Sequence, residues 1–273
     1  MFYLYILISV AAVLISDRAF GLIRQPYGWW AVPVMLISVF LLLVILHILV
    51  LLISALMINM NKPMKGKSRY WRAIANLSLP LAFKLARVHI HTSGLEKVPE
   101  NTRFLLVCNH THDFDPAVII GELPKAELGF VGKKEICDQL PLIARIMHKL
   151  NCLFIDRENN RAAAKTIVEA VRTIKDDTAS IGIFPEGYTS LDGELHQFRN
   201  GAFKIAYKAN VPIVVCTLDG VPKIVKNMFI RRTDVYFDIL ETIMPEDFTD
   251  STAELGERIY NLMLENINKR KQQ

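Results

Sequence analysis

The sequence predicts an α/β domain that follows an apolar N-terminal region. After Gly94, apolar segments of strand length alternate with helix-like segments, which is typical of a largely parallel central sheet flanked by helices. Polar clusters directly follow the strand-like segments, as expected at the carboxyl edge of such a sheet. We divide the chain into a hydrophobic membrane anchor (1–60), a basic amphipathic juxtamembrane segment (61–94) and a folded domain (95–273).

The anchor contains one segment long enough to cross a bilayer and a second, shorter one. Ala31 to Ile58 is apolar apart from one histidine and a few serines, and it exceeds the roughly 20 residues that a transmembrane helix needs. Met1 to Ser16 lacks the basic start of a secretory signal. Asp17 and Arg18 then interrupt the apolar pattern, and Trp29-Trp30 resembles an interfacial belt. Met1 to Ser16 is therefore either a crossing that completes a helical hairpin or a segment lying in one leaflet.

The stretch after the apolar span carries a run of cations without an acidic residue between Asn59 and Gly94. Its basic residues are Lys62, Lys65, Lys67, Arg69, Arg72, Lys84 and Arg87. Next to a membrane span, such a run indicates an anionic lipid surface as the partner rather than nucleic acid. The positive-inside rule then puts the rest of the chain on the cytoplasmic side. Because aromatic and leucine residues interleave with the cations, this stretch is either an amphipathic surface element or an ordinary packed helix.

The pattern of apolar residues in the folded domain predicts six strands and five helices. The strands are expected at 103–108, 128–131, 152–155, 180–184, 211–218 and 235–240. The helices are expected at 117–123, 141–150, 161–175 and 201–209, and from Ser251 onward. Asn210 is a predicted C-cap, and Ser251 with Glu254 has the spacing of a capping box.

The first polar cluster, Asn109 to Pro116, directly follows the strand expected at 103–108. Asp115-Pro116 predicts a helix start with Asp115 as the N-cap. Across so short a loop, Asp115 can accept a hydrogen bond from one imidazole nitrogen of His110 and raise the basicity of the other. The pair therefore predicts a general base, and the alternative is a cap beside an ordinary turn residue.

Two further polar clusters follow strands. Asp156 and Arg157 come after the strand at 152–155, and an arginine there can hold a phosphate bidentately. Phe184 to Ser190 forms a tight Pro-Glu-Gly turn whose N–H groups can bind a phosphate or an oxyanion. Taken singly, these clusters are equally compatible with a surface ion pair and a plain turn.

Together and in this order, the clusters resemble the motifs of the lysophosphatidic acid acyltransferase family, the glycerolipid acyltransferases. The family motifs are N-H-x4-D, F-I-D-R, F-P-E-G followed by T-R-S, and V-P-I. Their matches here are Asn109, His110 and Asp115; Phe154 to Arg157; Phe184 to Gly187 with Ser190; and Val211 to Ile213. Phe130 to Ile136 is similar to the family's strand before the second motif, and the resemblance spans roughly Val88 to Leu218.

The resemblance implies that residues 95–273 are an acyltransferase domain with the glycerolipid acyltransferase fold. Its reaction in phospholipid biosynthesis would move an acyl group from acyl-CoA or acyl-carrier protein to the free hydroxyl of a lysophospholipid. With 1-acylglycerol-3-phosphate as the acceptor, the product is phosphatidic acid. His110 would deprotonate the hydroxyl and Asp115 would orient His110, without a metal or other cofactor. The implied substrate-binding residues are Asn109, Arg157, Glu186, Gly187 and Ser190, and N–H groups near Gly187 would stabilise the oxyanion.

Three positions depart from the family pattern. Tyr188 and Thr189 stand where the family usually has Thr and Arg, which removes a cation expected near the acceptor phosphate. This difference makes a lysophospholipid with another head group a credible acceptor. His112 stands where a serine is common.

Two other classes of function compete with the acyltransferase. His110 and His112 with Asp113 and Asp115 suggest a metallohydrolase, but Phe114 occupies the position where an H-x-H-x-D pattern needs its aspartate. A non-catalytic membrane lipid-binding protein that kept the fold is the other alternative.

Overall fold

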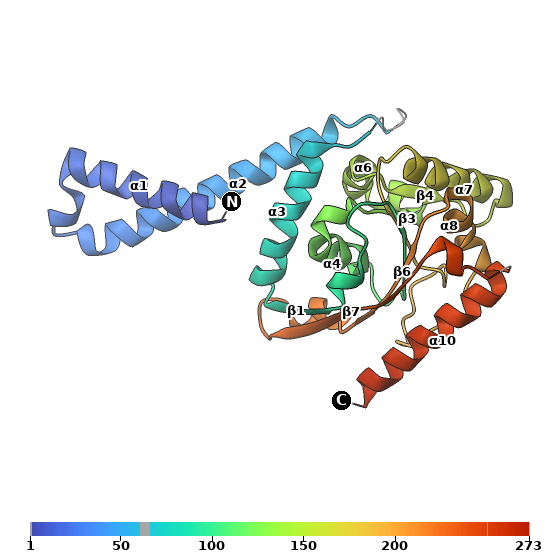
Figure 1. Ribbon diagram of the computed structural model, residues 1–273. Coiled ribbons are helices and arrows are strands. Elements are labelled where there is room, and N and C mark those ends of the chain that lie inside the picture. Colours follow the sequence, from blue (N-terminus) through green and yellow to red (C-terminus); the bar gives the residue numbers. More distant parts are fainter. Residues whose placement is uncertain (1, 61–65, 250, 273) are drawn as a thin grey trace. The chain divides into compact units, whose positions relative to one another are not determined.

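A computed structural model describes residues 2–60, 66–249 and 251–272 (Figure 1). Lys62 and Lys65 of the basic run lie outside the described residues. The chain divides into two compact units, Met1–Asn59 and Met60–Gln273. The boundary between them falls directly after the apolar N-terminal region.

The first unit is a helical hairpin of α1 (Phe2–Phe20) and α2 (Gly28–Leu56). By length and composition, both helices could cross a membrane. Helix α1 continues through Asp17 and Arg18, where the apolar pattern stops. The Asp17 carboxylate accepts the N–H of Ile23 at 2.8 Å, so this acidic residue closes the turn between the helices.

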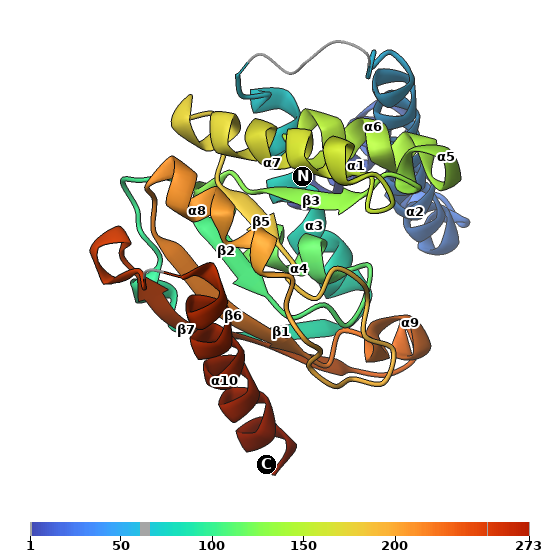
Figure 2. The ribbon, with the colours of Figure 1, turned by 90° about the vertical axis from the view of Figure 1, so that its right-hand side faces the viewer.

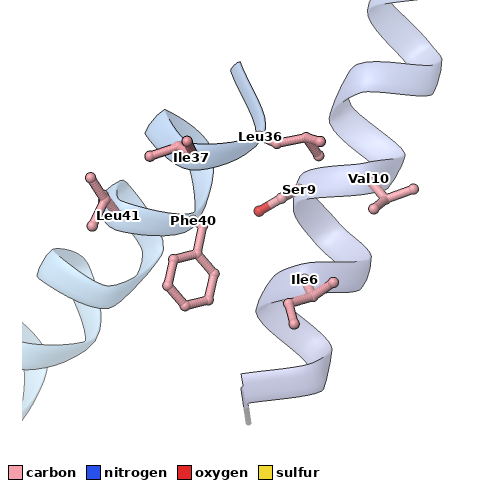
Figure 3. Close-up of a pocket in the computed structure, with 7 residues that line it drawn as sticks. All are labelled: Ile6, Ser9, Val10, Leu36, Ile37, Phe40 and Leu41. Atoms are coloured by element: carbon pink, nitrogen blue, oxygen red, sulfur yellow. The ribbon is translucent and has the colours of Figure 1, made fainter. Parts of the chain in front are cut away.

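The two helices of the hairpin face each other across an apolar groove of about 320 Å³ (Figure 3). The groove is lined by Ile6, Ser9, Val10, Leu36, Ile37, Phe40 and Leu41. Ser9 is the polar member, and its hydroxyl donates to the Tyr5 carbonyl oxygen at 2.8 Å. The outward surface is also apolar, with Leu42 and Ile53 61% and 58% exposed. Helices that are apolar on all sides are typical of a membrane environment.

The second unit is built on a sheet of seven strands in the order β1-β7-β6-β2-β5-β3-β4. The strands are β1 (Val88–Ser93), β2 (Leu105–Cys108), β3 (Gly129–Lys133), β4 (Leu153–Ile155), β5 (Ile181–Ile183), β6 (Ile213–Asp219) and β7 (Thr233–Ile243). Strands β6, β2, β5, β3 and β4 are mutually parallel, while β7 runs antiparallel to β6. The predicted α/β fold with a largely parallel sheet is confirmed.

Strand β1 lies in the segment for which no strand was expected. It pairs with β7 at the edge of the sheet, and its burial alternates. A half-exposed edge strand keeps polar side chains on one face, so Val88–Ser93 has no continuous apolar run that would mark it in the sequence.

The helices of the second unit cover both faces of the sheet (Figure 2). They are α3 (Arg69–Leu85), α4 (Asp115–Glu122), α5 (Ile136–Gln139), α6 (Pro141–Lys149), α7 (Asn160–Lys175), α8 (Lys204–Ala209), α9 (Lys223–Asn227) and α10 (Thr252–Lys271). The segment expected to be helical at 201–209 begins as a 3-10 turn, Asn200–Ala202, and Asn210 ends α8 in the left-handed conformation predicted for a C-cap. Ser251 accepts the N–H of Ala253 at 3.1 Å and caps α10 as predicted.

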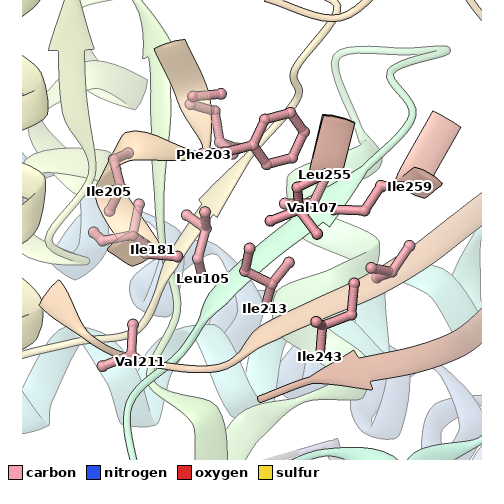
Figure 4. Close-up of a cluster of buried hydrophobic side chains, with 14 of the residues drawn as sticks. Leu105, Val107, Ile181, Phe203, Ile205, Val211, Ile213, Ile243, Leu255 and Ile259 are labelled. Atoms are coloured by element: carbon pink, nitrogen blue, oxygen red, sulfur yellow. The ribbon is translucent and has the colours of Figure 1, made fainter. Parts of the chain in front are cut away.

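The main core lies between the central strands and helices α7, α8 and α10 (Figure 4). Leu105, Ile181 and Ile213 contribute from the sheet, Phe203 from the N-cap of α8 and Leu255 from α10, all fully buried. Apolar side chains of this kind each contribute roughly 1.5–3 kcal/mol when buried. The core therefore fixes the strands whose carboxyl ends carry the polar clusters.

Helix α3 attaches to the sheet through Arg72. This buried guanidinium donates to the carbonyl oxygens of Leu128, Glu127 and Leu150 at 2.6, 2.9 and 2.6 Å. The helix also exposes apolar side chains, with Leu77 50% exposed. Part of the stretch expected to be amphipathic thus packs as an ordinary helix through one face.

Candidate active site

The carboxyl ends of β2 and β5 bring His110, Asp115 and the Phe184–Ser190 turn together. His110 Nδ1 lies 2.9 Å from Asp115 Oδ2, the hydrogen-bonded pair expected from the sequence. The His110 ring stacks on Phe184 with 4.1 Å between ring centroids. The His110 side chain is 14% exposed, while that of Asp115 is completely buried. The imidazole is thereby positioned by Asp115 and Phe184 and stays partly exposed.

Asp115 closes the loop around His110 instead of capping its own helix. Helix α4 begins at Asp115, and the N-cap position is Phe114, so the predicted cap role is wrong. Asp115 Oδ2 accepts the backbone N–H groups of Thr111 and His112 at 2.6 and 2.9 Å. The carboxylate points back into the loop because these N–H donors and the His110 ring converge there.

Glu186 ties the His110 loop to a second loop. Its carboxylate oxygens accept the backbone N–H of His110 at 2.8 Å and that of His196 at 3.0 Å, and the residue is 1% exposed. Burial raises the pKa of the Glu186 carboxyl, while the two N–H donors oppose that rise. The ionised form is the one that both donors favour.

Asn109 and Ser190 also use their polar atoms within the protein. The Asn109 amide accepts the N–H of Leu218 at 2.8 Å and donates to its carbonyl oxygen at 2.9 Å, which joins the ends of β2 and β6. Ser190 N–H donates to the His110 carbonyl oxygen at 2.7 Å, and its hydroxyl lies 2.7 Å from Asp192 Oδ1. The predicted substrate contacts of Asn109, Glu186 and Ser190 stay predictions, but their side chains already hold the loops in place.

The turn at Gly187 favours a glycine because of its left-handed backbone conformation, and the Arg199 side chain packs against it. Gly187 has a φ of +80°, and a Cβ there would come within 2.7 Å of Arg199 Nε. Its own N–H donates to the Phe184 carbonyl oxygen at 3.1 Å and is not free for an oxyanion. Within the described chain, the N–H groups of Tyr188 and Thr189 make no hydrogen bond.

Arg157 is the predicted substrate-binding cation that remains available. It is half-buried, and in the described ranges it makes no ion pair or hydrogen bond. Burial and the nearby Arg199 guanidinium lower its pKa, and the Glu135 carboxylate opposes this shift. Because the charges of Arg157 and Arg199 disfavour each other, an anion such as a phosphate bound close to both would relieve the repulsion.

Arg199 was missed by the sequence analysis. It lies ten positions after Thr189, in a loop without a recognisable local pattern. Position 189 lacks the arginine that is usual in the family. If the acceptor phosphate needs a cation there, this lack indicates that another part of the chain supplies it.

Cys108 lies next to Asn109 but is not suited to be a nucleophile. It is fully buried, and its pKa is raised well above the usual range by burial, by a hydrogen bond with Cys216 and by the charges of Asp115 and Glu186. The reactive form of cysteine is the thiolate, which this environment disfavours. We expect Cys108→Ala to retain turnover, with no acyl-thioester on the wild-type protein by mass spectrometry after mixing with the acyl donor. A trapped acyl-Cys108 species would contradict this.

The metallohydrolase alternative finds no ligand cluster in the parts of the chain described. No group of three or more His, Cys, Asp or Glu side chains there could hold a metal ion. The His112 ring nitrogen Nδ1 instead accepts the N–H of Phe114 at 3.2 Å.

The comparisons with known proteins agree with the fold and the motifs. The family described as Acyltransferase matches residues 89–219. A protein of Mycoplasma pneumoniae named "Probable 1-acyl-sn-glycerol-3-phosphate acyltransferase" is 34% identical over 148 residues, which are 50% of this chain and 54% of that protein. The 1-acyl-sn-glycerol-3-phosphate acyltransferase of Haemophilus influenzae is 30% identical over 172 residues, 61% of this chain and 69% of that protein.

A solved structure shares the fold. The crystal structure of the 1-acyl-sn-glycerophosphate acyltransferase of Thermotoga maritima superposes with a TM-score of 0.60 at 23% identity, covering 75% of this chain and 80% of that one. This likeness shows the fold, and the similarity to the Haemophilus influenzae protein shows the class. The chain belongs to the acyltransferase family that includes the 1-acyl-sn-glycerol-3-phosphate acyltransferases. It spans about half the length of the first Mycoplasma relatives, 54% of each.

Proposed function

We propose that the protein is a membrane-anchored O-acyltransferase that moves an acyl group from a thioester to the free hydroxyl of a lysophospholipid. The observation that supports this most directly is the hydrogen-bonded His110–Asp115 pair at the carboxyl edge of the sheet, in a chain of this family. His110 Nδ1 and Asp115 Oδ2 are 2.9 Å apart. The names of the relatives support 1-acylglycerol-3-phosphate as the acceptor and phosphatidic acid as the product. The donor is acyl-CoA or acyl-carrier protein.

The proposed mechanism is a direct transfer. Asp115 accepts the Nδ1–H of His110, which leaves Nε2 free to take the proton of the acceptor hydroxyl. The hydroxyl oxygen attacks the thioester carbonyl carbon, and the N–H groups of Tyr188 and Thr189 stabilise the resulting oxyanion. The carbon–sulfur bond then breaks, and the leaving thiolate takes the proton from Nε2. The enzyme forms no covalent bond to the acyl group.

In this proposal, Arg157 and Arg199 hold the acceptor phosphate, and Arg199 supplies the cation absent at position 189. This assignment supports lysophosphatidic acid as the acceptor despite the altered third motif. Asn109, Glu186 and Ser190 assist by fixing the loops on which His110 and the Gly187 turn lie.

We expect Arg157→Ala and Arg199→Ala each to raise the acceptor KM by roughly 10- to 100-fold, because each loses a charge-assisted hydrogen bond to phosphate. The KM of the acyl donor should change little. Steady-state kinetics with both substrates varied would measure this, and Arg161→Ala, an exposed arginine on α7, is the matched control. An unchanged acceptor KM in both variants would exclude the phosphate role.

The helical hairpin is proposed to lie in the bilayer, with the second unit on the cytoplasmic side. The apolar surface of α1 and α2 supports the first part. The cations after the hairpin, including Lys67 and Arg69, support the second through the positive-inside rule.

The proposed function is tested by acyl transfer in membranes that contain the protein. A labelled acyl thioester, on coenzyme A or on carrier protein, is offered with a panel of lysophospholipids. We expect transfer by the wild type, with lysophosphatidic acid preferred. Transfer to a different head group would leave the reaction class standing but remove the acceptor assignment. No transfer from either donor to any acceptor would favour a non-catalytic lipid-binding protein.

A further inference from the structure

The segment 223–232, which we call the α9 tip, exposes apolar side chains outside the candidate active site. Val225, Phe229 and Ile230 are 55%, 67% and 75% exposed. Ile224 is 2% exposed and anchors the segment to the domain. The α9 tip is thus fixed at its base and apolar at its outer surface.

Cations alternate with these apolar residues along the α9 tip, and one of them, Arg232, pairs with Asp234 at 2.6 Å. Lys223, Lys226 and Arg231 are exposed and form no ion pair within the described ranges of the chain. No acidic residue occurs between Asp219 and Asp234. Exposed apolar side chains next to exposed cations are complementary to a bilayer with anionic lipids, where the apolar side chains enter the interface and the cations meet the head groups.

The backbone holds the apolar side chains outward. Phe229 has a φ of +66°, a left-handed conformation that is rare for a bulky residue. The turn is closed by the N–H groups of Ile230 and Arg231, which donate to the Asn227 carbonyl oxygen at 2.9 and 2.8 Å. A strained turn that presents an aromatic ring to solvent is a reason to look for a binding role.

The α9 tip lies on the same edge of the sheet as His110. It follows β6 directly, at the carboxyl end of that strand (Figure 2). The paired hydrogen bonds between Asn109 and Leu218, at 2.8 and 2.9 Å, bring this end of β6 beside the loop that carries His110. A membrane surface that bound the α9 tip would therefore face the edge of the sheet that carries His110.

We propose that the α9 tip is a second membrane contact, which inserts Phe229 and Ile230 into the interface of an anionic bilayer and turns the His110 edge toward it. The orienting role rests on the proposed function, because an acceptor that is a lipid reaches the site from the bilayer. The membrane contact itself does not depend on the activity.

The contact is tested with a spin label at position 229 of the full-length protein. Cys137, the partly exposed cysteine, is replaced by Ser, and the other three cysteines are buried. Phe229→Cys and, as a control, Val168→Cys on α7, which is 59% exposed, are labelled and reconstituted in phosphatidylcholine vesicles with or without phosphatidylglycerol. We expect the label at 229 to be shielded from a water-soluble relaxation agent in the anionic vesicles, and the label at 168 to stay accessible.

Removing the cations should release the α9 tip from the anionic vesicles. Each cation near an anionic surface contributes roughly fivefold to binding, so Lys223→Gln, Lys226→Gln and Arg231→Gln together should return the label at 229 to water. Equal accessibility of positions 229 and 168 would overturn the proposal. Shielding that is independent of lipid charge and rises with the protein-to-lipid ratio would indicate contact with a second copy of the chain and would also overturn it.

The orienting role has a separate readout. We expect Phe229→Ser with Ile230→Ser to slow transfer to an acceptor embedded in vesicles and to leave transfer to a short-chain acceptor in detergent unchanged. Equal loss with both acceptors would contradict the orienting role. An inactive wild type would count against the proposed function alone, since the label accessibility would still test the contact.

Discussion

His110→Ala should abolish most of the acyl transfer, with turnover reduced by roughly 10²- to 10⁴-fold. Alanine removes the Nε2 that we propose as the acceptor of the hydroxyl proton. The surrounding loop should persist, because Asp115 still accepts the N–H groups of Thr111 and His112, and Glu186 still accepts the backbone N–H at position 110. Turnover at saturating donor and acceptor measures the effect.

His112→Ala is the matched control, since His112 lies on the same loop and contacts Phe114 rather than Asp115 through its side chain. It should keep most of the activity. Equal losses in the two variants would mean that the loop conformation, and not a proton acceptor at His110, limits the rate. Full activity of His110→Ala would remove the general-base mechanism altogether.

Asp115→Asn should lower turnover by roughly 10²-fold, less than the loss in His110→Ala. Asparagine can keep its oxygen in the place of Oδ2, where it accepts the N–H groups of Thr111 and His112 and the Nδ1–H of His110. This neutral amide oxygen stabilises the protonated His110 that forms during proton transfer less well than the carboxylate does. Substrate KM values should change little because Asp115 is completely buried and out of reach of substrate.

The same substitution should also destabilise the fold, by about 1–3 kcal/mol, because a buried acceptor of several hydrogen bonds is replaced. Thermal unfolding beside the kinetics separates the two effects, and Asp113→Asn, an exposed neighbour, is the control. A variant that is fully folded at the assay temperature and fully active would show that the charge of Asp115 does not assist proton transfer at His110.

Much of the architecture was predictable because it depends on local patterns. The buried strands β2, β5 and β6 are continuous apolar runs, and α7 places apolar residues at helical spacing, so each was found within a few residues of its observed bounds. The His110–Asp115 contact was also predictable, since a five-residue separation across a short loop leaves few other arrangements. The edge strand β1 and the short helix α9 were not, because neither has an apolar run that distinguishes it from a loop.

The sequence by itself determined the class of fold, the apolar hairpin and the residues available for chemistry. Only the tertiary structure shows which of those side chains already hydrogen-bond within the protein and which remain available for substrate. Asn109, Glu186 and Ser190 were expected to contact substrate, and each meets backbone groups from another segment, such as Leu218 or His196, that no local pattern reveals. Arg199 comes beside Gly187 and Arg157 for the same physical reason: parallel strands bring their carboxyl ends to one edge, whatever the distance between them along the chain.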